Sequence, residues 1–60
     1  MTNLELIAEA ADLITKLADV DPQGVERGRG YFNDGLIAVR ADDWDTATVH
    51  FNRVIHLLNR

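Results

Sequence analysis

Residues 30–59, GYFNDGLIAVRADDWDTATVHFNRVIHLLN, decide the fold of this chain. Apolar side chains recur at helical spacing on both sides of an acidic corner that contains Asp42 and Asp43. Two amphipathic helices joined by so short a connection must fold back on each other. Because an Asp can accept hydrogen bonds from the free amides of a helix's first turn, we predict that Asp43 caps a helix running from Trp44 to Leu58. The apolar positions are Phe32, Leu36 and Val39 before the corner, and Trp44, Ala47, Phe51, Val54, Ile55 and Leu58 after it.

The N-terminal residues predict a further helix. Thr2 and Glu5 form a capping-box pattern, which places the start of this helix at Asn3. Asp12 and Lys16 have the spacing of an i,i+4 ion pair. One helix face is apolar (Leu6, Ile7, Ala10, Leu13, Ile14, Leu17 and Ala18), and the opposite face carries Glu5, Glu9, Asp12, Lys16 and Asp19. We interpret the acidic face as solvated surface, with contact to a basic partner as the alternative.

A middle helix, from Pro22 to about Ala41, contains all four glycines of the chain. Asp21 is placed to cap it, since proline suits the first helical position and disfavours helical geometry in the residue before it. Glycine inside a helix costs up to about 1 kcal/mol relative to alanine, so some compensating contact is expected. One face carries Gly24, Gly28, Tyr31, Gly35 and Ala38. We predict that this face packs closely against the first helix, the third helix or a second copy of the chain; fraying or bending near Gly28–Gly30 is the alternative.

The stretch from Tyr31 to Asn59 resembles one tetratricopeptide (TPR) repeat, a helix pair that this family stacks with a period of about 34 residues. The matching residues are Tyr31, Gly35, Asp43, Trp44, Asp45, Ala47, Phe51 and Leu57, whereas Ala38, Val54 and Asn59 depart from the family's pattern. The corner at Pro22 resembles the close of a preceding repeat, so the resemblance covers about one and a half divergent repeats. It implies an all-α fold, a three-helix antiparallel helical-hairpin array that forms a single domain over residues 1–60.

Composition limits the classes of function. Sixty residues make one domain, and a domain of this size buries only about 60% of its unfolded surface. The chain has no cysteine, and its two histidines do not share a helix face, so we expect no disulfide and no metal centre. The net charge of −4 argues against direct binding of nucleic acid. Because no apolar run approaches the roughly 20 residues of a membrane span and no signal-peptide pattern is present, we expect a cytoplasmic protein without a membrane partner.

No pattern of residues indicates catalysis. No Ser, Thr or Lys has a base at a motif spacing, and the acidic side chains available for a carboxylate pair lie on predicted helix surfaces. Asp42, Asp43 and Asp45 lack the further oxygen ligands of a calcium loop, so we interpret them as capping residues. We therefore expect no enzyme activity, no catalytic residues and no cofactor.

Ile37, Val49 and Leu57 are left outside a three-helix core, which indicates protein binding, because a stacked repeat cannot bury both of its faces alone. We predict a partner-binding surface that comprises Tyr31, Phe32, Ile37, Val49 and Leu57. The first hypothesis is a small scaffold or adaptor that self-associates as a homodimer and binds a protein or peptide. The second is a small acidic inhibitor or antitoxin-like protein that covers a basic surface of an enzyme or a nucleic-acid-binding protein. A purely structural part of a larger assembly is a third possibility.

Overall fold

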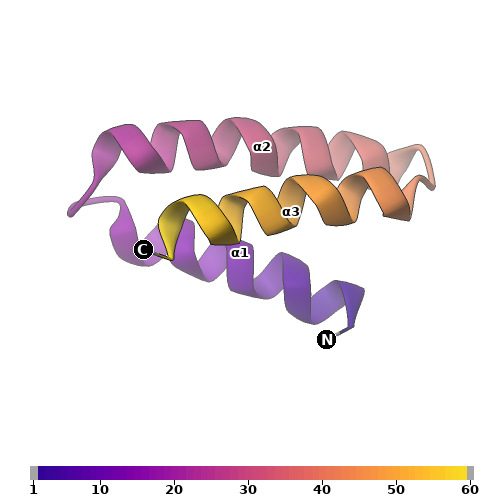
Figure 1. Ribbon diagram of the computed structural model, residues 1–60, viewed down its shortest axis with the longest axis horizontal. Coiled ribbons are helices and arrows are strands. Elements are labelled where there is room, and N and C mark those ends of the chain that lie inside the picture. Colours follow the sequence, from indigo (N-terminus) through magenta and orange to yellow (C-terminus); the bar gives the residue numbers. More distant parts are fainter. Residues whose placement is uncertain (1, 60) are drawn as a thin grey trace.

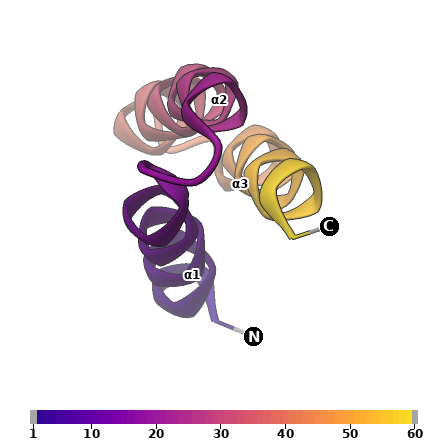
Figure 2. The same ribbon diagram turned by 90° about the vertical axis from the view of Figure 1, so that its left-hand side faces the viewer.

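The computed structural model describes residues 2–59, which form three α-helices joined by two tight corners (Figure 1). Helix α1 covers Asn3–Leu17, α2 covers Pro22–Arg40 and α3 covers Trp44–Leu58. Consecutive helices run in opposite directions, and α1 lies on one side of the α2–α3 pair and contacts both helices (Figure 2). The predicted all-α, three-helix arrangement is therefore confirmed. Helix α2 ends one residue earlier than predicted, with Ala41 as its C-cap.

Each helix begins at the side-chain cap that the sequence predicts. The Thr2 hydroxyl accepts a hydrogen bond from the Glu5 amide at 3.2 Å, and Asp21 Oδ1 accepts one from the Gly24 amide at 3.1 Å. Asp43 accepts two bonds from Thr46, from the amide to Oδ1 at 3.2 Å and from the hydroxyl to Oδ2 at 2.6 Å. These bonds satisfy amides that have no partner within their own helix, which fixes where each helix starts.

The corner between α2 and α3 is closed by backbone hydrogen bonds. The Asp42 amide donates to the Val39 carbonyl at 2.9 Å, and the Asp43 amide donates to the Ala38 carbonyl at 2.8 Å. This pair of bonds is the Schellman arrangement, in which the first residue past the C-cap is left-handed. Asp42 occupies that position with φ 57°, a conformation that Asp tolerates better than most residues. Asp43 therefore ends α2 through its backbone and starts α3 through its side chain.

Helices α2 and α3 approach each other closely along the glycine-containing face of α2. An added Cβ on Gly35 would lie 2.8 Å from two ring carbons of Phe51, and one on Gly28 would lie 3.1 Å from Leu58 Cδ1. Phe51 is 1% exposed, so the missing side chain of Gly35 is what makes room for its ring. Of the three packing partners left open by the sequence, the structure selects the third helix. Helix α2 is continuous through Gly28–Gly30.

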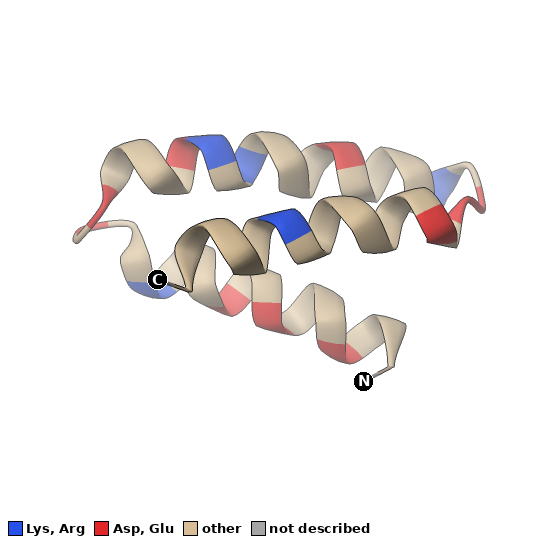
Figure 3. Cartoon of the chain, in the orientation of Figure 1, with Lys and Arg blue, Asp and Glu red and all other residues tan. Residues whose placement is uncertain are grey.

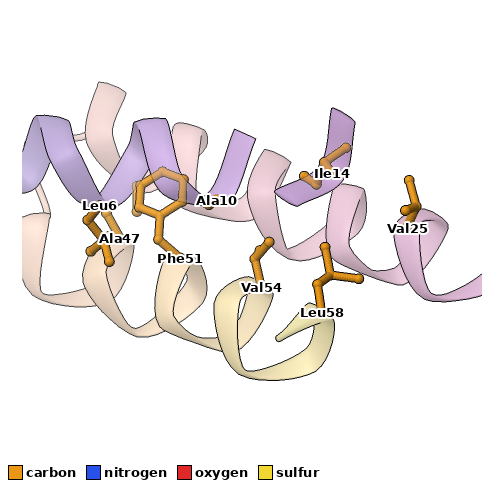
Figure 4. Packing of buried hydrophobic residues seen from close by; sticks show 9 residues of the cluster. Leu6, Ala10, Ile14, Val25, Ala47, Phe51, Val54 and Leu58 are labelled. Atoms are coloured by element: carbon orange, nitrogen blue, oxygen red, sulfur yellow. The ribbon is translucent and has the colours of Figure 1, made fainter. Parts of the chain in front are cut away.

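The core is a single cluster to which all three helices contribute (Figure 4). Helix α1 closes it with three residues at i, i+4 and i+8 spacing. The buried apolar side chains are Leu6, Ala10, Ile14, Val25, Ala38, Ala47, Phe51, Val54 and Leu58. No polar or charged residue is buried among residues 2–59, so this part of the fold is held by apolar packing and by its helix caps.

Most of the larger apolar residues of α2 lie at the edge of the core. Phe32, Leu36 and Val39 are half-buried and pack against the core cluster, whereas Val25, Gly28, Gly35 and Ala38 are buried. The Phe32 ring contacts the Phe51 ring edge-on, with centroids 5.3 Å apart and planes at 62°. Small residues therefore form the line of closest contact with α3, and the larger apolar residues pack beside it.

Two glycine variants test this packing. Gly35→Ala should lower the free energy of unfolding by about 1–3 kcal/mol, since its Cβ would overlap the enclosed Phe51 ring. Gly30→Ala should raise the free energy of unfolding by about 0.5–1 kcal/mol, since Gly30 is exposed and nothing lies within 4 Å of the added carbon. Urea unfolding followed by circular dichroism, at one protein concentration, measures both. Equal effects of the two substitutions would contradict the proposed contact.

The Asp43 cap predicts a pH dependence. Hydrogen bonds from the hydroxyl and then the amide of Thr46 hold the pKa of Asp43 below its ordinary value of 3.8. Because the folded state has the lower pKa, this stabilisation is complete well above pH 3.8 and is lost as the pH falls through the folded-state pKa. Asp43→Ala should therefore lower the melting temperature at neutral pH, with a difference from the parent that narrows in acid.

Asp43→Asn is the matched control for this site. Its amide oxygen can still accept the hydrogen bond from the Thr46 amide, so Asp43→Asn should lower the melting temperature less than Asp43→Ala does. Because its side chain does not titrate, the pH dependence caused by the Asp43 carboxyl should be absent. Added calcium should leave the melting temperature of the parent unchanged. A calcium-dependent rise that disappears in Asp43→Ala would show that the corner is a cation site.

Candidate protein-interaction site

An open groove lies between α2 and α3. Its volume is about 550 Å³, and Tyr31 of α2 forms one wall while α3 forms the rest of its lining. Helix α1 contributes none of the lining residues and packs on the other side of the helix pair (Figure 2). The lining residues are Tyr31, Val49, Asn52, Arg53, His56 and Leu57.

The apolar part of the groove comes from three of the five residues predicted to bind a partner. Tyr31 is 37% exposed and Val49 is 50% exposed, and Leu57 is half-buried. Val49 and Leu57 are two helical turns apart on α3, opposite Tyr31 on α2. These three side chains therefore lie together.

The other two predicted residues lie outside the groove lining. Phe32 is half-buried with its ring against Phe51, so its main contact is internal. Ile37 is 61% exposed on α2. Three of the five predicted residues therefore line the groove, while Ile37 is exposed elsewhere on α2 and Phe32 lies at the edge of the core.

The polar residues of the groove, Asn52, Arg53 and His56, are not among the residues that the sequence predicted to bind a partner. Their spacing of three, four and seven residues from Val49 places them on one face of α3. This signal is present in the sequence, but nothing there shows that the face borders Tyr31. Arg53 is held there by its contact with the Tyr31 ring, because its guanidinium carbon lies 5.9 Å from the ring centroid. That distance is within the range of a cation–π interaction.

Among residues 2–59, Arg53 is the only Lys, Arg, Asp or Glu residue that lines the groove. The chain as a whole has ten acidic and six basic residues, so the groove departs from the overall charge balance. Among residues 2–59 the structure forms one ion pair, between Asp12 and Lys16 at 2.9 Å. Arg53 therefore has no carboxylate partner within that range, and its donors are available to a ligand.

Most of the acidic residues lie on α1 and at the two corners, and two others lie on α2 (Figure 3). Glu5 and Asp12 are exposed, and Asp42, Asp43 and Asp45 are exposed at the α2–α3 corner. A hydrogen bond from Lys16 to Asp12, together with the attraction of their charges, raises the pKa of Lys16. The start of α1, which carries Glu5, and the α2–α3 corner lie at the same end of the molecule (Figure 1), whereas Asp12 lies in the middle of α1. The negative charge is therefore spread over several elements.

The histidines have different surroundings. His56 is exposed and lines the groove, whereas His50 is half-buried and its Nδ1 atom has no hydrogen-bond partner. Within residues 2–59, no three His, Asp or Glu side chains are grouped so that they could hold a metal ion. No helix among these residues is long and apolar enough to cross a membrane.

No protein-family model or curated protein matches this sequence, and no solved structure matches the fold. The functional argument therefore rests on the groove, the exposed apolar residues and the distribution of charge.

Proposed function

We propose that this chain is a small non-catalytic protein–protein interaction module, a scaffold or adaptor that self-associates and binds a protein or peptide partner. One observation carries the proposal: Tyr31, Val49 and Leu57 lie together around an open groove on the uncovered side of the α2–α3 pair. A groove with apolar walls between two helices suits an amphipathic helix or an extended peptide. Buried area at such a site would supply the binding free energy.

The resemblance to a TPR repeat gives this groove a structural role. The contact of Gly35 with Phe51 and the complete burial of Ala47 support a TPR-like packing of α2 on α3, with α1 in the place of a preceding half repeat. In a stacked array the open face of the last helix pair is covered by the next helix. The described residues contain no such helix, so the groove is the place where a binding partner would take its position.

Self-association is proposed through the outer face of α2. Ile37 is 61% exposed there and does not line the groove, so two copies can associate through this face while the groove stays open. A specific interface of about 800 Å² per copy would cover about a fifth of the accessible surface of 4230 Å². For a domain this small, that burial is a large addition to its stability.

The dimer has a direct test. Light scattering should report a homodimer at high micromolar concentration, and the melting temperature should rise with protein concentration. Ile37→Asp should shift the mass to that of a monomer and remove the concentration dependence. Val49→Asp is the matched control at an exposed apolar position of the groove, and it should leave the dimer intact. A monomeric parent with a concentration-independent melt would refute the dimer.

The acidic surface favours a second candidate function. Exposed Glu5 and Asp12 on α1, and the aspartates of the α2–α3 corner, could meet a basic surface on an enzyme or a nucleic-acid-binding protein. Such a protein would act as an inhibitor by occlusion. Many weak charge contacts would then supply the attraction, and salt would screen them.

Salt dependence separates the two functions. The intact chain is used to capture its partner from an extract of the source cell, and the partner is then purified. The affinity of the partner for the chain is measured as the salt concentration rises from about 0.05 M to about 0.5 M. For an adaptor, the affinity should change by only about twofold and should be lost in Tyr31→Ala, because apolar burial dominates. For an inhibitor, the affinity should fall steeply as the salt concentration rises. Glu5→Gln should also weaken binding, whereas Tyr31→Ala should have little effect on it.

A further inference from the structure

The geometry points to a specific class of partner: the groove binds an amphipathic helix of another protein that places an Asp or Glu side chain against Arg53. This inference rests on the proposed function and adds the chemistry of the ligand. It follows from three features of the groove as residues 2–59 form it, namely its length, its one charged residue and the absence of an acidic residue from its lining.

The length of the groove fits two turns of a helix. Val49 and Leu57 are eight positions apart on α3, which corresponds to about 12 Å along the helix axis. A partner helix lying along α3 would present apolar residues at i, i+4 and i+7 over that distance. Tyr31 and Val49 offer exposed apolar surface for these anchors, and Leu57 lies at the other end. The anchors would therefore cover side chains that are now partly in water.

Arg53 supplies the specificity. It lies between Val49 and Leu57 in the sequence of α3, and its guanidinium sits over the Tyr31 ring. Arg53 forms no ion pair among residues 2–59, so its N–H groups can bind a carboxylate in a two-bond geometry. An acidic residue on the partner would complete the site.

A second copy of the same groove is a poor occupant. In a two-fold dimer formed groove to groove, the Arg53 side chains of both copies would share one interface, and the described part of each lining contains no carboxylate to compensate. Like charges in an interface disfavour the complex. The partner therefore differs from this groove in charge, and it is a helix that is acidic where the groove is basic.

A displayed library of amphipathic peptides tests the inference. Peptides of about 16 residues, with leucine fixed at i, i+4 and i+7 and the other positions randomised, are selected for binding to the intact chain. The selected peptides should be enriched in Asp or Glu at one register position. Their affinity should fall about tenfold or more in Arg53→Glu and by a smaller factor in Arg53→Lys, which keeps the charge but loses the two-bond geometry.

Arg53 is exposed, so its variants should fold, and equal melting temperatures verify that they do. Val49→Asp is the control that separates this inference from the proposed function. If the selected peptides show no acidic preference and bind Arg53→Glu as tightly as the parent, yet lose affinity in Val49→Asp, the groove binds helices without the charge pairing and the inference fails alone.

If Val49→Asp also has no effect on peptide affinity, or if no peptide is enriched, both the inference and the groove function are overturned. A dimer that dissociates in Val49→Asp and persists in Ile37→Asp would also overturn the inference, because a second copy would then be the occupant of the groove.

Discussion

The close approach of α2 and α3 at Gly35 is the constraint on which the rest of the structure depends. The Phe51 ring lies in the space that a side chain at position 35 would take, and that ring is the largest fully buried side chain of the core. Because the two helices meet along small residues, Phe32, Leu36 and Val39 of α2 lie half-buried at the edges of the contact. Phe32 lies at one such edge, where its ring meets Phe51.

This arrangement also determines what the surface can do. Helix α1 covers one side of the α2–α3 pair, and the other side is left open because residues 2–59 contain no fourth helix. Tyr31, Val49 and Leu57 consequently border a groove. In a larger array a neighbouring helix would bury such a face, and in a domain of this size it remains a surface where a partner can gain contact area.

Charge divides the molecule into two kinds of surface. Most acidic side chains lie on the outside of α1 and at the corners, where they cap helices or face solvent. Arg53 lies in the groove beside an aromatic ring and without a carboxylate partner among the described residues. An apolar groove that contains a cation can discriminate among partner helices by charge, whereas dispersed acidic residues favour partners only by general attraction. The two proposed functions thus use different parts of the same fold.

The sequence by itself determined the helices and their boundaries. Helical periodicity identified three segments, and the caps Thr2, Asp21 and Asp43 placed their starts, because capping depends only on residues within one turn. It also indicated that Ile37 and Val49 lie outside the core, whereas Leu57, which was expected there too, is half-buried against it. The turn at Asp42 was local too, but a left-handed Asp has no unique sequence signal, so its role was found only in the structure.

The tertiary structure alone decided which helix meets the glycine-containing face, that small residues form the contact line, and that Arg53 sits over Tyr31. These features join residues that are far apart in the chain. Periodicity within one helix gives the direction of a side chain around that helix, but it does not give the rotation or depth at which two helices pack. That choice depends on the fit of Phe51 beside Gly35, which exists only once the helices are together.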